Sequence, residues 1–150
     1  MPGTHHNLRL HLVFSTKHLE PTLTTDIQSR LYPFIGGIIR DEKGVLLEIG
    51  GMPDHLHLLV GWRTDDAIAN LVRNIKSRSS TWIHETFPAA PTFHWQEGYG
   101  VFTVSQSQVS KVRQYIQTQA EHHRKKTFQE EYVEFLRAHE IQYDDQYVFD

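Results

Sequence analysis

The chain has 150 residues, of which 39% are hydrophobic and 22% are charged, and its formal net charge is −3. This composition indicates one globular domain over residues 1–150 and excludes a disordered protein; no apolar run is long enough to cross a membrane. The absence of cysteine excludes disulfides and thiolate metal sites, and fits a cytoplasmic protein.

The charge is unevenly distributed along the chain. Residues 127–150 contain seven acidic residues and one Arg, whereas residues 1–126 carry a net charge of +3. Local charge governs phosphate binding more than the total does, so a negative total does not exclude nucleic acid. A solvated surface with an acidic end explains the charges equally well.

The first predicted element is a half-buried strand over residues 8–15, where apolar and other residues alternate in LRLHLVFS. Apolar residues then recur at helical spacing between residues 27 and 38, after the helix-start sequence TLTTD. Pro33 and the following Gly-Gly pair predict a kink or a break in this helix. Residues 45–49 and 55–60 predict a hairpin joined by the turn sequence GGMPD.

A second long helix is predicted to begin at the Thr-Asp-Asp sequence of residues 64–66, which supplies an N-cap hydroxyl and two acids near the helix dipole. Its apolar stripe covers residues 68–83, and the sequence PAAP at residues 88–91 ends it. Residues 101–104 predict a further strand.

Two capping-box patterns predict the remaining helices. Ser105 with Gln108 opens a third helix, and Thr127 with Glu130 opens a last one. The resulting order, β-α-β-β-α-β-α-α, predicts an α+β fold. We expect a ferredoxin-like or RRM-like antiparallel sheet with helices on one face and an added C-terminal helix that carries Tyr115.

Two histidines stand out in the strand sequence DHLHLLV. Successive side chains of a strand alternate between faces, so His55 and His57 point the same way and the leucines point toward the core. We expect the histidines on the face opposite the first two helices. Their backbones lie roughly 7 Å apart, close enough for both rings to converge on one ion. A bare H-x-H pattern is more often a pair of strand histidines without a ligand.

A second pair of polar residues strengthens the metal-site interpretation. Tyr115 and Gln119 stand at positions i and i+4 of the third helix and share one face of it. Gln119 supplies a third, oxygen ligand in this interpretation, and the hydroxyl of Tyr115 lies beside the ion. The sequence lacks the Cys and H-E-x-x-H patterns of zinc proteases.

The sequence resembles the single-tyrosine transposases of the HUH superfamily, which include insertion-sequence enzymes and their REP-associated relatives. HUH denotes His, a hydrophobic residue and His, here His55-Leu56-His57 in PDHLHLL. The resemblance also covers HLVFSTK, WQEGYG and YIQTQAEHHRKKTFQEEY, in an order that spans nearly the whole chain.

The resemblance implies an enzyme that cleaves single-stranded DNA beside a hairpin and rejoins it. Tyr115 is then the nucleophile and forms a 5′-phosphotyrosine intermediate. His55, His57 and Gln119 are implied to hold a divalent ion, Mg²⁺ or Mn²⁺, and imidazole ligands favour Mn²⁺. The sequence does not identify the base that deprotonates Tyr115.

Basic residues around the tyrosine helix and on the second helix are candidate phosphate contacts, although any one of them alone is more often solvated. They are Arg73, Lys76, Arg78, Lys111, Arg113, Arg124, Lys125 and Lys126. The resemblance also implies a homodimer, in which the tyrosine helix of one subunit acts either in its own subunit or in trans. The polar segment of residues 104–110 is short enough to act as a flexible connection between the sheet and the tyrosine helix.

Three other functions stay open at this point. An RRM-like nucleic-acid binder without catalysis lacks its usual mark here, because His55, His57 and Leu59 occupy the strand positions where aromatic residues are expected. A scaffold domain that has lost activity is the second alternative. The third is a nuclease of the replication-initiator HUH type, and such enzymes often carry further domains.

Overall fold

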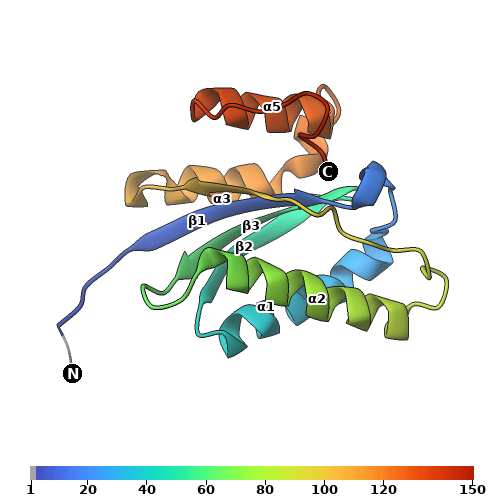
Figure 1. Ribbon diagram of the computed structural model, residues 1–150, viewed down its shortest axis with the longest axis horizontal. Coiled ribbons are helices and arrows are strands. Elements are labelled where there is room, and N and C mark those ends of the chain that lie inside the picture. Colours follow the sequence, from blue (N-terminus) through green and yellow to red (C-terminus); the bar gives the residue numbers. More distant parts are fainter. Residues whose placement is uncertain (1–2) are drawn as a thin grey trace.

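A four-stranded antiparallel sheet forms the centre of the computed structural model, which describes residues 3–150 (Figure 1). Its strand order is β2-β3-β1-β4, so the first and third strands are central. This order confirms the predicted ferredoxin-like fold. The strands are β1 (Leu8–Ser15), β2 (Val45–Met52), β3 (His55–Trp62) and β4 (Gly100–Thr103).

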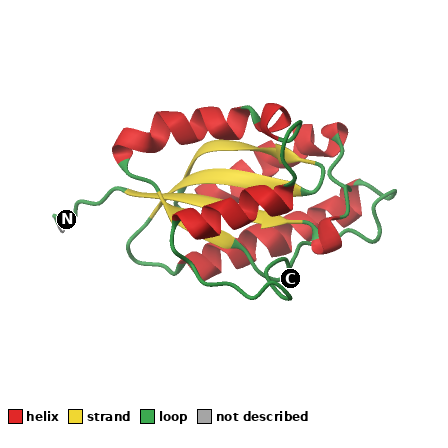
Figure 2. Cartoon of the chain, turned by 90° about the horizontal axis from the view of Figure 1, so that it is seen from above, coloured by secondary structure: helices red, strands yellow, loops and turns green. Residues whose placement is uncertain are grey.

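Helices cover both faces of the sheet (Figures 1 and 2). Two long helices pack on one face, and three shorter helices from the end of the chain lie on the other face. The helices are α1 (Thr25–Asp41), α2 (Ile68–Thr86), α3 (Val109–Gln117), α4 (Gln119–His122) and α5 (Phe128–Ala138). None of the helices in residues 3–150 is long and apolar enough to cross a bilayer.

The main core lies between the sheet and helices α1 and α2. Leu56 and Leu58 of β3 are fully buried there, in one cluster with Leu71 and Ile75 of α2. The alternation along β3 therefore turns the intervening histidines to the opposite face, as the sequence predicts. Each fully buried side chain of this size contributes about 1.5–3 kcal/mol of hydrophobic stabilisation.

Two smaller apolar clusters occupy the opposite face of the sheet. One joins Val13 of β1 and Phe102 of β4 to Phe128 and other residues of α5. The other joins Leu59 of β3 to Ile116 and other residues of α3. Helix α3 therefore covers one part of this face and α5 another, and the polar residues of β1 and β3 lie between them.

The first two helices differ from the sequence prediction at specific residues. Helix α1 runs without a break across Pro33 and the Gly-Gly pair, since its buried stripe holds it against the sheet. Helix α2 begins at Ile68, not directly after Thr64. The reason is that Asp66 Oδ1 accepts hydrogen bonds from Ala67 N and Asn70 Nδ2, and so supports a start further along the chain.

The third helix also differs in two ways. Ser105 makes no capping hydrogen bond, and a 3₁₀ turn over Gln106–Gln108 precedes α3, so the predicted first capping box is wrong. The helix then ends at Gln117, because Thr118 leaves helical geometry and its hydroxyl donates to the Gln114 carbonyl at 2.9 Å. The Thr127–Glu130 capping box of α5 is present as predicted.

Candidate functional site

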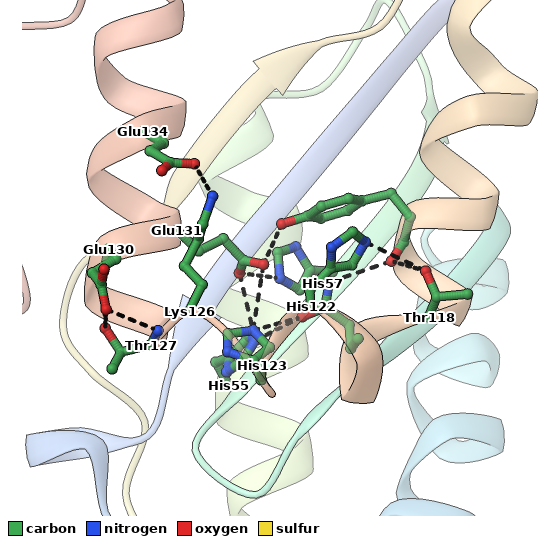
Figure 3. Close-up of polar contacts among 12 residues, drawn as sticks. His55, His57, Thr118, His122, His123, Lys126, Thr127, Glu130, Glu131 and Glu134 are labelled. Atoms are coloured by element: carbon green, nitrogen blue, oxygen red, sulfur yellow. Dashed lines mark hydrogen bonds and ion pairs between the residues drawn. The ribbon is translucent and has the colours of Figure 1, made fainter.

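A buried polar cluster lies between α3, α4 and α5 on the sheet face opposite α1 and α2 (Figure 3). His55 and His57 of β3 are at its base, and both are 0% exposed. Gln119 of α4 is 2% exposed, and its Oε1 lies 2.9 Å from His55 Nε2. The three residues that the sequence assigns to a metal site therefore meet in one place.

Gln119 reaches the histidines despite the break at Thr118. Its amide nitrogen donates to the backbone carbonyl of Tyr115 at 3.3 Å, as expected of residues one helical turn apart. His123 Nε2 lies 3.1 Å from Gln119 Oε1 on the other side. These contacts hold the amide in the cluster.

Glu131 of α5 is the central residue that the sequence interpretation missed. Its carboxylate oxygen Oε1 lies 2.8 Å from His57 Nε2 and 3.7 Å from His55 Nε2, and the residue is 3% exposed. A signal was present in the sequence: Glu131 follows Phe128 by three residues and precedes Phe135 by four, so it lies on the apolar stripe of its helix. A charge on such a stripe requires a buried partner.

The electrostatic setting keeps Glu131 ionised. Burial acts to raise the pKa of this carboxyl group, but hydrogen bonds from His57 and Tyr115 outweigh it and lower the pKa to about 2. His123 Nε2 also lies 3.3 Å from the second carboxylate oxygen, Oε2. A carboxylate kept ionised by donors in this way is a hydrogen-bond acceptor and can serve as a metal ligand at neutral pH.

Tyr115 of α3 lies directly beside this carboxylate. Its hydroxyl donates a hydrogen bond to Glu131 Oε2, and its ring centroid is 5.6 Å from that of His57. Burial raises the pKa of the Tyr115 phenol, and the hydrogen bond to ionised Glu131 raises it further. The ring of His122 packs against the tyrosine at 4.4 Å. The free tyrosinate is therefore disfavoured in this state, and a proton acceptor is already in contact.

Each histidine of the pair has an outer hydrogen-bond partner behind it. His55 Nδ1 lies 2.7 Å from Asp54 Oδ1. His57 Nδ1 lies 2.9 Å from Nε2 of His11, a buried residue of β1. Burial lowers the pKa of His11 to about 3 and that of His57 to about 4, so both rings are neutral at neutral pH.

The donor atoms of the cluster fit a divalent ion. One ligand atom from each of His55, His57 and Glu131 can be chosen so that all three lie within 4.8 Å of one another. Adjacent ligand atoms of an octahedral ion with bonds near 2.1 Å are about 3 Å apart. The observed separations agree with this value: His57 Nε2 lies 2.8 Å from Glu131 Oε1, and His55 Nε2 lies 2.9 Å from Gln119 Oε1. Two imidazoles, a carboxylate and an amide oxygen form a mixed set of nitrogen and oxygen donors.

A cavity of about 820 Å³ opens beside Tyr115 and Glu131. Among its lining residues are His122 and three of the predicted phosphate contacts, Arg124, Lys125 and Lys126. The Lys126 ammonium lies 2.6 Å from Glu134 of α5, which also lines this cavity. The cavity therefore combines Tyr115 with three basic and three acidic residues, and Arg124 is paired with Glu121 of the same lining.

The other predicted phosphate contacts are distributed over two helices. Lys111 and Arg113 are exposed on α3, with Arg113 Nε 3.6 Å from Glu48. The three basic residues of α2 lie on the far side of the sheet from the polar cluster. There Arg73 and Arg78 are exposed, while the Lys76 ammonium donates to the carbonyls of residues 96–98.

A family model and a curated relative both match this chain, and both describe transposases. The family model described as IS200-like transposase matches residues 4–119. The ISDra2 transposase TnpA of Deinococcus radiodurans is 24% identical over 122 residues, which cover 78% of this chain and 87% of that protein.

Solved structures share the fold. A protein from Deinococcus radiodurans R1 described as a transposase superposes with a TM-score of 0.66 at 27% identity, covering 79% of this chain and 95% of that one. A REP-associated tyrosine transposase bound to a REP hairpin superposes with a TM-score of 0.56 at 16% identity, covering 77% and 70%. The family match includes His55, His57, Tyr115 and Gln119 and ends before α5. The chain belongs to the IS200-like family of single-tyrosine HUH transposases.

Proposed function

We propose that this chain is a metal-dependent transposase that cleaves and rejoins single-stranded DNA at hairpins through a 5′-phosphotyrosine intermediate on Tyr115. One observation carries the proposal. The hydroxyl of Tyr115, the carboxylate of Glu131 and the imidazoles of His55 and His57 meet in a single cluster beside a cavity whose lining includes Arg124, Lys125 and Lys126 together with three acidic residues. A hairpin substrate is supported by the REP hairpin bound to the relative of similar fold.

The tyrosine and the glutamate carry out the proton and bond changes of the cleavage step. Tyr115 Oη forms a bond to phosphorus, the bond from phosphorus to the 3′ oxygen breaks, and the phenolic proton passes to Glu131. The departing 3′ oxygen takes up a proton from solvent. Rejoining reverses these changes, and Glu131 returns the proton to the leaving tyrosine.

The two oxygens of Glu131 serve different neighbours. Oε1 faces His57 and Oε2 accepts from Tyr115, so one carboxylate can be a metal ligand and a proton acceptor together. His55, His57 and Glu131 would hold the ion, with Gln119 as a further oxygen ligand. The ion, when bound, neutralises charge on the scissile phosphate. We infer Mn²⁺ or Mg²⁺, with Mn²⁺ binding more tightly because two ligands are imidazoles.

Access of DNA to the histidines requires a shift of α5 that leaves Glu131 within reach of the ion and of Tyr115. Both histidines are 0% exposed beneath the helices, with Glu131 of α5 in contact with His57 and Gln119 of α4 in contact with His55. A phosphodiester cannot contact a ring that has no exposed surface. The non-helical residues 123–127 join α4 to α5 and are the natural hinge for this movement.

The test is a covalent-adduct assay with single-stranded hairpin DNA and Mn²⁺, read on a denaturing gel. Tyr115→Phe should bind the hairpin and form no adduct, because only the nucleophilic oxygen is removed. Tyr132→Phe is the matched control, since Tyr132 packs in the apolar cluster of α5. Peptide mass spectrometry that locates the adduct on Tyr99 or Tyr132 would refute the assignment of the nucleophile.

A further inference from the structure

His11 is a buried histidine that the proposed reaction does not use. It lies on β1 and is 3% exposed, and its ring centroid is 5.1 Å from that of His57. The rings of Phe102 and Phe135 enclose it at 6.2 Å and 5.1 Å. Its Nε2 atom makes a hydrogen bond of 2.9 Å with His57 Nδ1. A polar ring in such surroundings is costly unless it has a hydrogen-bonding role.

The position of the proton on this bond follows from the neighbouring contacts. Ionised Glu131 can only accept hydrogen bonds, so His57 Nε2 carries a proton when it contacts Glu131 Oε1. A neutral imidazole has one proton, and His57 Nδ1 is then an acceptor. His11 Nε2 must therefore be the donor in the structure described here.

Metal binding would require the opposite arrangement. An imidazole binds a metal through a nitrogen without a proton, so His57 Nε2 loses its proton and Nδ1 carries it. His57 Nδ1 then donates, and His11 Nε2 must accept. Each ring keeps one proton throughout, so the change is one of tautomer and not of charge.

We propose that His11 is a positioning residue for His57, and that its imidazole reverses the hydrogen bond to His57 Nδ1 when His57 Nε2 changes from a donor to Glu131 into a metal ligand. This inference rests on the proposed metal site. It explains the residue type, because histidine can both donate and accept at one nitrogen. Lysine and arginine only donate, and an ionised carboxylate only accepts.

The partner of the other histidine provides the contrast. Asp54 accepts from His55 Nδ1, and on the cluster side His55 Nε2 lies against Gln119 Oε1. A carboxylate cannot donate, so Asp54 keeps the Nδ1 proton of His55 whether or not a metal is bound. At His57 the hydrogen bond from Nε2 to Glu131 would be replaced by a bond to the ion, with Glu131 as a further ligand, and His11 is the partner of Nδ1 that can reverse its hydrogen bond accordingly.

Calorimetric titration with Mn²⁺ tests the proposal through binding affinity. His11→Leu should raise the dissociation constant about 10- to 100-fold, as expected for loss of an outer partner of a metal-binding histidine. His11→Gln should stay within about threefold of wild type, because an amide can present either its oxygen or its nitrogen. His139→Gln is the matched control: His139 packs on Phe102 near His11 and should leave the affinity unchanged.

The outcomes separate this proposal from the proposed metal site. If His57→Ala abolishes Mn²⁺ binding while His11→Leu binds like wild type, the metal site stands and the role of His11 is overturned. If His57→Ala binds Mn²⁺ like wild type, the metal site itself fails, and the role of His11 fails with it. Circular dichroism shows whether each variant is folded.

The wild-type chain gives a second readout in case His11→Leu does not fold. Imidazole ¹⁵N chemical shifts distinguish the two tautomers of each histidine, and diamagnetic Zn²⁺ replaces Mn²⁺ as the probe. Without zinc, His11 and His57 should both carry their proton on Nε2; with zinc, both should carry it on Nδ1. A change at His57 with no change at His11 would overturn the proposal, and no change at either ring would reject the metal site.

Discussion

The hydroxyl of Tyr115 donates a hydrogen bond to the carboxylate of Glu131, and this contact joins α3 to α5 across one face of the sheet. The same carboxylate contacts His57 of β3. The family match ends before α5, yet α5 supplies the only acid within the buried group of potential metal ligands found in residues 3–150. The role of Glu131 is therefore the first matter to test.

Glu131→Gln removes the negative charge and keeps the size of the side chain. We expect the dissociation constant for Mn²⁺ to rise at least about tenfold and adduct formation to slow about 100-fold, since one ligand and one proton acceptor are lost together. Glu134→Gln is the control, because Glu134 pairs with Lys126 at the surface of the same helix. Calorimetry and the adduct gel measure the two effects. Wild-type Mn²⁺ affinity in Glu131→Gln would remove this residue from the metal site.

Helix α5 should loosen when DNA binds, because both histidines are fully buried beneath it. Hydrogen–deuterium exchange of residues 128–138 should increase when hairpin DNA is added to Tyr115→Phe, which cannot form the adduct. The amides of α2 on the other face of the sheet provide the internal reference. Unchanged exchange in α5 at saturating DNA would show that the strand reaches the site by another route.

The free energy of unfolding should decrease as the pH falls from 6.5 toward 4. The pKa of His57 is about 4 and that of His11 about 3 in the folded chain, both below the ordinary value of 6.5. The unfolded chain therefore binds more protons in this range, and each histidine contributes a slope of up to about 1.4 kcal/mol per pH unit. Glu131 adds to the loss only below pH 4.5, because its folded pKa is about 2.

Denaturant titrations at several pH values measure this slope. His11→Gln should reduce the slope of unfolding free energy against pH by about the contribution of one histidine. Groups that face His11 are His57, Glu131 and His139, and all three remain in that variant. His5→Gln at an exposed position controls for the loss of a histidine elsewhere. An equal slope in wild type and His11→Gln would contradict the expectation.

The two capping-box sequences make a matched pair for stability. Thr127 accepts from Glu130 N and the reciprocal bond is present, whereas Ser105 makes no capping bond. Thr127→Ala should lower the free energy of unfolding by about 1 kcal/mol. Ser105→Ala should change it by less than about 0.5 kcal/mol. Similar losses in both variants would mean that the Ser105 pattern acts as a cap in solution.

This pair also shows where sequence patterns fail. A capping box is defined by two residue types three apart, and the pattern cannot tell whether a regular helix begins there or a 3₁₀ turn intervenes. Pro33 is a similar case, because the buried stripe of α1 outweighs one lost hydrogen bond. Strand alternation was more reliable: the core of β3 needs Leu56 and Leu58, and this need alone places His55 and His57 on the other face.

Parts of the site could be predicted and parts could not. The spacing of Tyr115 and Gln119 anticipated their shared position, since four residues make one turn even with the break at Thr118. The spacing of Glu131 indicates that it is buried, but its contact with His57 could not be predicted, because that contact depends on how α5 folds back over the sheet. His11 was visible in the alternation of β1, which turns it to the same face as His57, but its partner depends on the register of β1 against β3.

The last prediction concerns the homodimer and the origin of the tyrosine. An uncovered sheet face would favour a dimer, but α3, α4 and α5 of the same chain cover the face opposite α1 and α2 (Figure 1). Strand transfer still needs two cuts held close together, so the dimer stays a prediction, to be measured by light scattering. Within one chain, Tyr115 already lies beside its own His57. A mixture of Tyr115→Phe and His57→Ala subunits should therefore remain inactive after verified subunit exchange, because each chain forms an incomplete site. Cleavage by the mixture would show that the tyrosine helix acts in trans, since only a crossed dimer combines the intact tyrosine of one variant with the intact histidines of the other.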